Sequence, residues 1–500
     1  MHRSLLPLLA LLSLAAPAGA QNAAAPPAPK EADKPVPAPN VSVTRHVGTF
    51  GGQRVAYTAT AGETYLKAED GTPRASIFSV SYVKEPRDPS RPVTFLFNGG
   101  PGSGSLWLHM GAFGPKRVAI PSDARDDGAP PYPVVDNPDS LLDATDLVFI
   151  DPVGTGFSHA LGKTDPKEFY GVTKDAQSVA EFIRLWLNEN GRWTSPKYVG
   201  GESYGTTRTA AVLNQLEGSY NDVALNGIIL ISTVLDFGAG ADVPGNEMSY
   251  ILNLPSMAAT ALYHGKAQAP SVEAFVEEAR RYATGPYAAA LLKGQRLGAD
   301  ERAAVRRELA RFTGLSEAYL EQTDLRVDPA RFYKELLRDR GLTIGRLDAR
   351  YTGRDYDNAG ERPDNDPSFY GIDGAYAAAV NTQLRDNLKY KTDRSYMSIS
   401  GIGGQWDWRL GGGRDNDVYV NVAPYIGRAM RENSGLRVFV GQGYFDFATP
   451  FFGAEYSLSR TGIPQDRIVY AYYGSGHMMY VREQDRVALS RDIREFIRGR

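Results

Sequence analysis

A tight glycine-flanked turn near residue 203 joins a predicted strand to a predicted helix. The turn spans residues 201–205 (GESYG), with the β-prone segment 197–200 directly before it and the helix-prone segment 206–216 directly after it. Such a sharp turn leaves room only for glycine at its flanks, and it exposes the central serine at the carboxyl end of a sheet. The first turn of the new helix also directs backbone N–H groups at negative charge that forms there. The turn therefore predicts a nucleophilic serine on an α/β scaffold.

Strands and helices alternate on both sides of this turn. Short apolar segments predict further strands at 93–97, 146–150, 227–231, 437–440 and 467–473. Apolar residues repeat with helical period at Val179, Phe182, Ile183, Trp186 and Leu187, and again at Leu489, Ile493, Phe496 and Ile497. Strands that alternate with helices predict βαβ units and a mainly parallel sheet.

The remaining segments predict how the chain is divided. A basic start, a short apolar run and the small residues before Gln21 predict a signal peptide over 1–20, so we expect export to the periplasm or out of the cell. Further parts follow in order: a disordered Ala/Pro-rich leader over 21–40, a first part of the α/β domain over 41–234, a mainly helical cap insertion over 235–424, and a second part of the α/β domain over 425–500. The first α/β part opens with short β-prone stretches and glycine turns, which predict an antiparallel meander.

Composition excludes several classes of protein. The chain contains no cysteine, which rules out disulfides, thiolate metal sites and a cysteine nucleophile. Its formal net charge of −3 gives no global basic field for nucleic acid. Its apolar runs are too short for a transmembrane helix, so we expect no stable membrane insertion. We also expect no metal and no cofactor, and the oligomeric state stays open.

A serine nucleophile needs a general base, and histidine is the usual one. In this topology the partners follow the serine along the chain in the order acid, then histidine. Only His264 and His477 come after Ser203, and His264 lies in the predicted cap. His477 lies in a glycine-rich turn directly after a predicted strand, where an imidazole can project back to the serine. We therefore predict His477 as the base.

The base needs a carboxylate to orient it, and a developing oxyanion needs N–H donors. Asp446 follows the predicted strand 437–440 and precedes the histidine. Two other aspartates also come between or near these positions, but Asp466 begins a predicted strand and Asp485 lies on the closing helix. Asp446 is thus the predicted acid. The glycine-rich turn 98–102 and the backbone N–H of Tyr204 are the available oxyanion donors.

Taken together, these motifs resemble the serine carboxypeptidase family. The resemblance rests on NGGPG (98–102), DPVGTGFS (151–158), GESYG (201–205), RVFVGQGYFDF (437–447) and GSGHM (474–478). It implies an α/β-hydrolase fold with a mainly parallel central sheet, N-terminal antiparallel strands and a helical cap insertion. It also implies a serine-type carboxypeptidase that releases C-terminal residues from peptides with a free C-terminus through an acyl-enzyme.

The resemblance assigns roles to eight residues. It implies Ser203, Asp446 and His477 as the catalytic residues, Gly100 and Tyr204 as oxyanion-hole donors, and Asn98, Gly99 and Glu202 as ligands of the substrate carboxylate. Two carboxylates approach closely only if they share a proton. Peptidase activity should therefore fade as pH rises past the titration of Glu202.

The sequence departs from the family pattern at some positions. Ala112 stands where the family carries a second glutamate behind Glu202, and Ser103 replaces a cysteine after the glycine-rich turn. The missing cysteines fit a bacterial branch. Two other classes of function stay open: an esterase or acyltransferase that uses the same triad, and a non-catalytic binding protein. The presence of all three predicted triad residues argues against the last.

Overall fold

The computed structural model describes residues 36–218, 222–241, 243–410 and 419–499. The predicted signal peptide and most of the predicted leader lie outside these ranges. The end of the leader is held in place, because the backbone N–H of Asn40 donates to Glu63 (2.9 Å) and the hydroxyl of Tyr65 donates to the Pro37 carbonyl (3.0 Å). None of the helices in the described ranges has the length and apolar character needed to cross a membrane.

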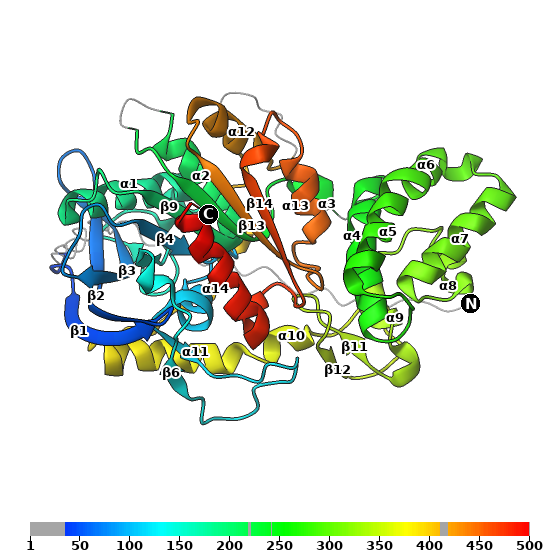
Figure 1. Ribbon diagram of the computed structural model, residues 1–500, viewed down its shortest axis with the longest axis horizontal. Helices are drawn as coiled ribbons and strands as arrows, with labels where there is room; N and C mark the ends of the chain where they lie inside the picture. The colour runs from blue at the N-terminus through cyan, green and yellow to red at the C-terminus, as the bar shows by residue number, and fades with distance from the viewer. Residues whose placement is uncertain (1–35, 219–221, 242, 411–418, 500) are drawn as a thin grey trace, which may run out of the picture. The chain divides into compact units, whose positions relative to one another are not determined.

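A large mixed sheet forms the centre of the molecule (Figure 1). Its strands follow the spatial order β1-β2-β3-β7-β4-β9-β10-β13-β14, and β8 pairs with β3. The strands of the described residues are β1 (Val41–Phe50), β2 (Gln53–Lys67), β3 (Pro73–Glu85), β4 (Val93–Phe97), β5 (Lys116–Val118), β6 (Val134–Asp136), β7 (Asp146–Ile150), β8 (His159–Ala160), β9 (Lys197–Ser203), β10 (Gly227–Thr233), β11 (Thr343–Ile344), β12 (Thr352–Gly353), β13 (Arg437–Gly443) and β14 (Ile468–Tyr473).

Strand direction divides the sheet into two parts. β1, β2 and β3 form an antiparallel meander, and β3 pairs antiparallel with β7. From β7 onward the neighbouring strands β4, β9, β10, β13 and β14 all run parallel. The predicted fold class is therefore confirmed: a mainly parallel sheet with N-terminal antiparallel strands. The carboxyl ends of the parallel strands meet at one edge, where β9 ends in Ser203.

Helices cover both faces of the sheet. The α-helices are α1 (Val172–Asn190), α2 (Tyr204–Leu216), α3 (Phe237–Gly240), α4 (Glu247–Tyr263), α5 (Val272–Tyr282), α6 (Ala288–Lys293), α7 (Ala299–Thr313), α8 (Glu317–Gln322), α9 (Pro329–Glu335), α10 (Pro367–Tyr370), α11 (Asp373–Thr382), α12 (Ala423–Glu432), α13 (Phe451–Leu458) and α14 (Glu483–Ile497). Helices α1, α2 and α12 share one apolar cluster with the sheet, and α11 and α14 share another with the opposite face.

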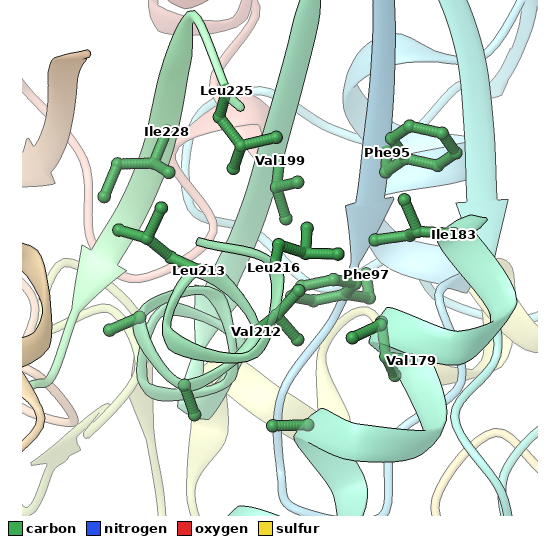
Figure 2. Packing of buried hydrophobic residues seen from close by; sticks show 14 of the residues in the cluster. Phe95, Phe97, Val179, Ile183, Val199, Val212, Leu213, Leu216, Leu225 and Ile228 are labelled. Carbon is green, nitrogen blue, oxygen red and sulfur yellow. The ribbon is translucent and has the colours of Figure 1, made fainter. Parts of the chain in front are cut away.

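Residue alternation along the strands explains this layering. Phe95 and Phe97 of β4 join the cluster under α1 and α2, whereas Leu96 between them joins the opposite cluster. Figure 2 shows Phe97 close to Val179 of α1 and Val212 of α2. Because side chains alternate across a strand, a continuous apolar segment such as β4 fills both cores at once. This burial holds the strand ends that carry the site in fixed positions.

Helical insertions lie between β10 and α12. Helices α4 to α9 lie together to the right of the sheet in Figure 1. Their apolar residues form a third cluster that also includes Tyr444, Phe445, Phe447 and Phe451, which follow β13. The insertion thus packs directly against the segment that carries Asp446. The predicted cap boundary at residue 424 falls inside α12, whose Ile426 packs with the first cluster, and the boundary itself stays a prediction.

Candidate active site

The turn that carries Ser203 is a strained strand-to-helix junction. β9 ends at Ser203, α2 begins at Tyr204, and Ser203 takes φ 61° and ψ −132°. A positive φ is unfavourable for a residue with a side chain, so the surrounding structure must hold it there. A Cβ on Gly201 would lie 2.2 Å from the carbonyl oxygen of Gly205, which explains the glycine at position 201. The turn therefore presents a half-buried serine at the edge of the sheet.

Asp446 and His477 form a buried hydrogen-bonded pair. The Nδ1 atom of His477 lies 2.8 Å from Oδ2 of Asp446. The other oxygen, Oδ1, accepts the backbone N–H groups of Ala448 (2.8 Å) and Thr449 (3.0 Å), and the Thr449 hydroxyl donates to Oδ2 at 2.7 Å. Burial disfavours the charged imidazole, but the Asp446 carboxylate outweighs it and raises the pKa of His477 above its ordinary value. A fixed carboxylate beside Nδ1 leaves Nε2 free to accept a proton.

A cavity of about 1090 Å³ brings the predicted residues together. Its wall includes Asn98, Gly99, Gly100, Glu202, Ser203, Tyr204 and His477, and Asp446 lies behind the histidine. Residues of the helical insertions also line the cavity, among them Leu252, Tyr333, Arg346 and Phe369. All eight residues predicted from the sequence therefore belong to one site.

Asn98 and Glu202 form the polar floor beside the serine. The amide Nδ2 of Asn98 donates to Oε1 of Glu202 at 3.1 Å, and its Oδ1 accepts the backbone N–H of Leu108 at 3.1 Å. Burial raises the pKa of Glu202 to about 7, although nearby His477 opposes the shift. A carboxyl group with this pKa still carries a proton in mildly acidic solution.

The glycine-rich turn lies directly on the serine turn. A Cβ on Gly99 would lie 2.6 Å from the backbone nitrogen of Tyr204, so only glycine permits this approach. Gly100 takes φ 101°, a conformation that also favours glycine. Two backbone turns in such close contact can supply N–H groups to the same oxygen atom.

A buried ion pair that the sequence analysis missed supports this contact. Arg208 of α2 is 1% exposed, and its Nε lies 2.6 Å from the Asp175 carboxylate of α1. The same guanidinium donates to the carbonyl oxygen of Asn98 and lies over the rings of Phe97 and Tyr204. No local sequence signal marks Arg208, because its partners come from other parts of the chain.

We predict that Asp175→Ala lowers the free energy of unfolding by about 3–5 kcal/mol, because it leaves the Arg208 guanidinium buried without its carboxylate. Urea denaturation measures this loss, with Asp393→Ala, at an exposed aspartate, as the control. A loss of less than about 1 kcal/mol in Asp175→Ala would mean that solvent or another group compensates the guanidinium.

A segment of the insertion, residues 346–349, contacts both the acid turn and the base turn. The backbone N–H of His477 donates to the Leu347 carbonyl at 2.6 Å, and the N–H of Phe447 donates to the Arg346 carbonyl at 3.1 Å. Ala349 donates to the Phe445 carbonyl at 3.0 Å. The sequence carries no motif here, because these contacts use backbone groups. The insertion therefore helps to hold Asp446 and His477 in register.

Ala112 leaves the site without a second glutamate. It lies fully buried in the π-helical turn Leu108–Phe113.

The tryptophans of the glycine-rich segment after residue 400 pack instead of lining the cavity: Trp406 donates to the Tyr204 hydroxyl at 3.1 Å, and Trp408 packs on Phe237.

The sheet order and the serine turn define an α/β-hydrolase fold that carries an Asp–His pair beside the serine. Comparison with known proteins narrows this class. Residues 57–248, about two fifths of the chain, match the family model described as serine carboxypeptidase. The matched segment includes the glycine-rich turn and the serine turn but ends before Asp446 and His477.

Individual proteins are also similar to this chain. The chain is 27% identical over 158 residues to Serine carboxypeptidase-like 13 of Arabidopsis thaliana, a match that covers 31% of this chain and 35% of that protein. The chain thus spans about a third of that relative's length. The crystal structure of Kex1(delta)p, a prohormone-processing carboxypeptidase from Saccharomyces cerevisiae, aligns with 89% of this chain and 91% of its own at 16% identity, with a TM-score of 0.53. At this identity the second likeness shows the fold.

Proposed function

We propose that this protein is a serine-type carboxypeptidase that releases C-terminal residues from peptides. The observation that carries the proposal is the buried Asn98–Glu202 pair beside Ser203, because a protonated carboxyl group and an amide N–H are donors suited to a substrate carboxylate. A site of this kind selects substrates that end in a free carboxylate. The family match of residues 57–248 supports the same function.

In the proposed mechanism, the hydroxyl of Ser203 attacks the carbonyl of the last peptide bond while His477 takes its proton. The N–H groups of Gly100 and Tyr204 stabilise the oxyanion, and Asp446 stabilises the imidazolium. The imidazolium then protonates the departing amine, which leaves an acyl group on Ser203. Water, deprotonated by His477, attacks the acyl carbon; the bond to Ser203 then breaks, the imidazolium returns its proton to the Ser203 oxygen, and the shortened peptide leaves as a carboxylic acid. Asn98, Glu202 and the backbone of Gly99 hold the terminal carboxylate of the substrate throughout acylation.

The test compares an N-blocked dipeptide with its C-terminal amide across acid to neutral pH. Both substrates need neutral His477. The ratio of kcat/KM for the free acid to kcat/KM for the amide therefore cancels the titration of His477 and reports the titration of Glu202. Protonated Glu202 accepts the free acid, and ionised Glu202 repels it, so we predict a ratio that falls about tenfold per pH unit above a pH of about 7. In Glu202→Gln the ratio should not change with pH.

Two results would contradict the proposal. A ratio near one at every pH would mean that the site does not recognise the carboxylate. Failure to cleave either peptide, combined with rapid hydrolysis of simple esters, would favour the esterase or acyltransferase class. Ala112 would then mark a changed specificity.

We also propose that the protein is exported after cleavage near Ala20 and belongs to a cysteine-free bacterial branch of the family. The basic start, the apolar run and the small residues before Gln21 support export, and the absence of cysteine supports the branch. Mass measurement of the N-terminus of the mature protein tests the cleavage, which a retained Met1 would contradict.

A further inference from the structure

Two buried polar atoms beside the proposed carboxylate site lack hydrogen-bond partners among the described residues. They are Oε2 of Glu202 and the hydroxyl of Tyr480. Both side chains are almost fully buried, at 4% and 3% exposure. An unpaired polar group in the interior is costly, so two neighbouring ones point to an interaction between them.

The surroundings of Tyr480 place its ring next to the position of the missing glutamate. A Cβ on Gly111 would lie 2.7 Å from the ring of Tyr480, and Gly111 directly precedes Ala112 in the π-helical turn. Tyr480 itself lies three residues after His477, in the short helix Met479–Val481. The missing side chain at Gly111 thus leaves room for the tyrosine ring, and the segment that carries His477 also carries the hydroxyl.

Electrostatics indicates that the two groups act on each other. Burial raises the pKa of Tyr480 well above its ordinary value, so the hydroxyl keeps its proton and remains a donor. Burial raises the pKa of Glu202, and the neighbouring Tyr480 lowers it in part. The other groups that face Glu202 are His477 from the same segment, Asp446 after β13, Asn98 after β4 and Tyr376 of α11.

We propose that Tyr480 is a positioning residue that donates its hydroxyl to Glu202 and so sets the orientation and protonation of the carboxyl group that receives the substrate carboxylate. In this role Tyr480 replaces the second glutamate, whose position Ala112 occupies. Tyr480 does not line the cavity, so it acts through Glu202 and not on the substrate. This inference rests on the proposed function for its consequence, whereas the interaction between Tyr480 and Glu202 can be tested without any substrate.

The test measures the titration of Glu202 in the folded protein without any substrate. Because its folded pKa lies above its unfolded value, Glu202 contributes stability at low pH, and this contribution is lost as pH rises through the folded pKa. The difference in unfolding free energy between the wild type and Glu202→Gln, measured by urea denaturation at a series of pH values, therefore levels off above that pKa. The same difference is then measured between Tyr480→Phe and the double variant.

In Tyr480→Phe we expect the pH at which the difference levels off to rise by about one unit, because ionised Glu202 has lost a donor. Tyr282→Phe is the matched control, since it removes another buried hydroxyl that has no hydrogen-bond partner in the described part of the chain, on α5. In Tyr480→Phe, the pH above which the ratio of kcat/KM for the free acid to that for the amide falls should rise by the same amount.

An unchanged titration of Glu202 in Tyr480→Phe would overturn the inference and reduce Tyr480 to a packing residue. A shifted titration in a protein that does not discriminate between the free acid and the amide would uphold the Tyr480–Glu202 contact and contradict the proposed function. Equal shifts in Tyr480→Phe and Tyr282→Phe would also overturn the inference, because the effect would then be general.

Discussion

Replacing Ser203 with alanine is expected to reduce kcat for peptides and esters by roughly 10⁴-fold to 10⁶-fold. The alanine keeps the Cβ and the backbone conformation of the strained turn (φ 61°), so the fold should not change. What disappears is the oxygen that is proposed to form the acyl-enzyme. Residual hydrolysis would then come from water held near the oxyanion donors.

Covalent labelling checks this result independently of any substrate. An organophosphonate that reacts with activated serines should add one group to the wild-type chain and none to Ser203→Ala, as read from the intact mass. Equal thermal unfolding curves for the two proteins would exclude misfolding. Labelling of Ser203→Ala at the wild-type rate would show that another residue is the nucleophile.

Replacing Asp446 with asparagine is expected to reduce kcat by about 10⁴-fold while it leaves the fold intact. Two backbone N–H groups donate to Oδ1 of Asp446, at 2.8 Å from Ala448 and 3.0 Å from Thr449, and they require an oxygen at that position. The new amide nitrogen must therefore occupy the position of Oδ2 and donate to Nδ1 of His477. The imidazole then carries its proton on Nε2, the nitrogen that should face Ser203, and cannot act as a base.

The two rival acids supply the controls for this prediction. Asp466 is exposed in a short helix before β14, and Asp485 lies on α14, where it accepts a hydrogen bond from Ser475. Asp466→Asn should keep wild-type kcat, and Asp485→Asn should lose far less activity than Asp446→Asn. A loss in Asp485→Asn equal to that in Asp446→Asn would contradict the assignment of the acid.

Local patterns predicted much of the framework. The apolar segments at 93–97 and 146–150 match β4 and β7 residue for residue, because buried parallel strands are short, continuous and bounded by turns. The serine turn was predictable because the glycines that it requires lie within five consecutive residues, 201–205. The order of acid and base followed from chain topology, which requires no distance information.

The remaining features depend on contacts between distant parts of the chain. The strand 197–200 was predicted too short, because β9 continues through the glycines to Ser203 by pairing with β10. Arg208 reaches Asp175 and Asn98 from another helix, and the segment 346–349 contacts the triad turns through backbone groups. No periodicity or motif records such contacts. The role proposed for Tyr480 arises in the same way, from the space that Gly111 leaves in a distant turn.

The most direct test of the proposed carboxypeptidase activity follows a short peptide over time by mass spectrometry. The peptide has a free C-terminus, and its C-terminally amidated form is incubated in parallel at mildly acidic pH with the wild type and with Ser203→Ala. We predict successive loss of single residues from the C-terminus of the free peptide, little change in the amidated form, and no change with Ser203→Ala. Internal cleavage, or an intact free peptide alongside rapid ester hydrolysis, would contradict the account.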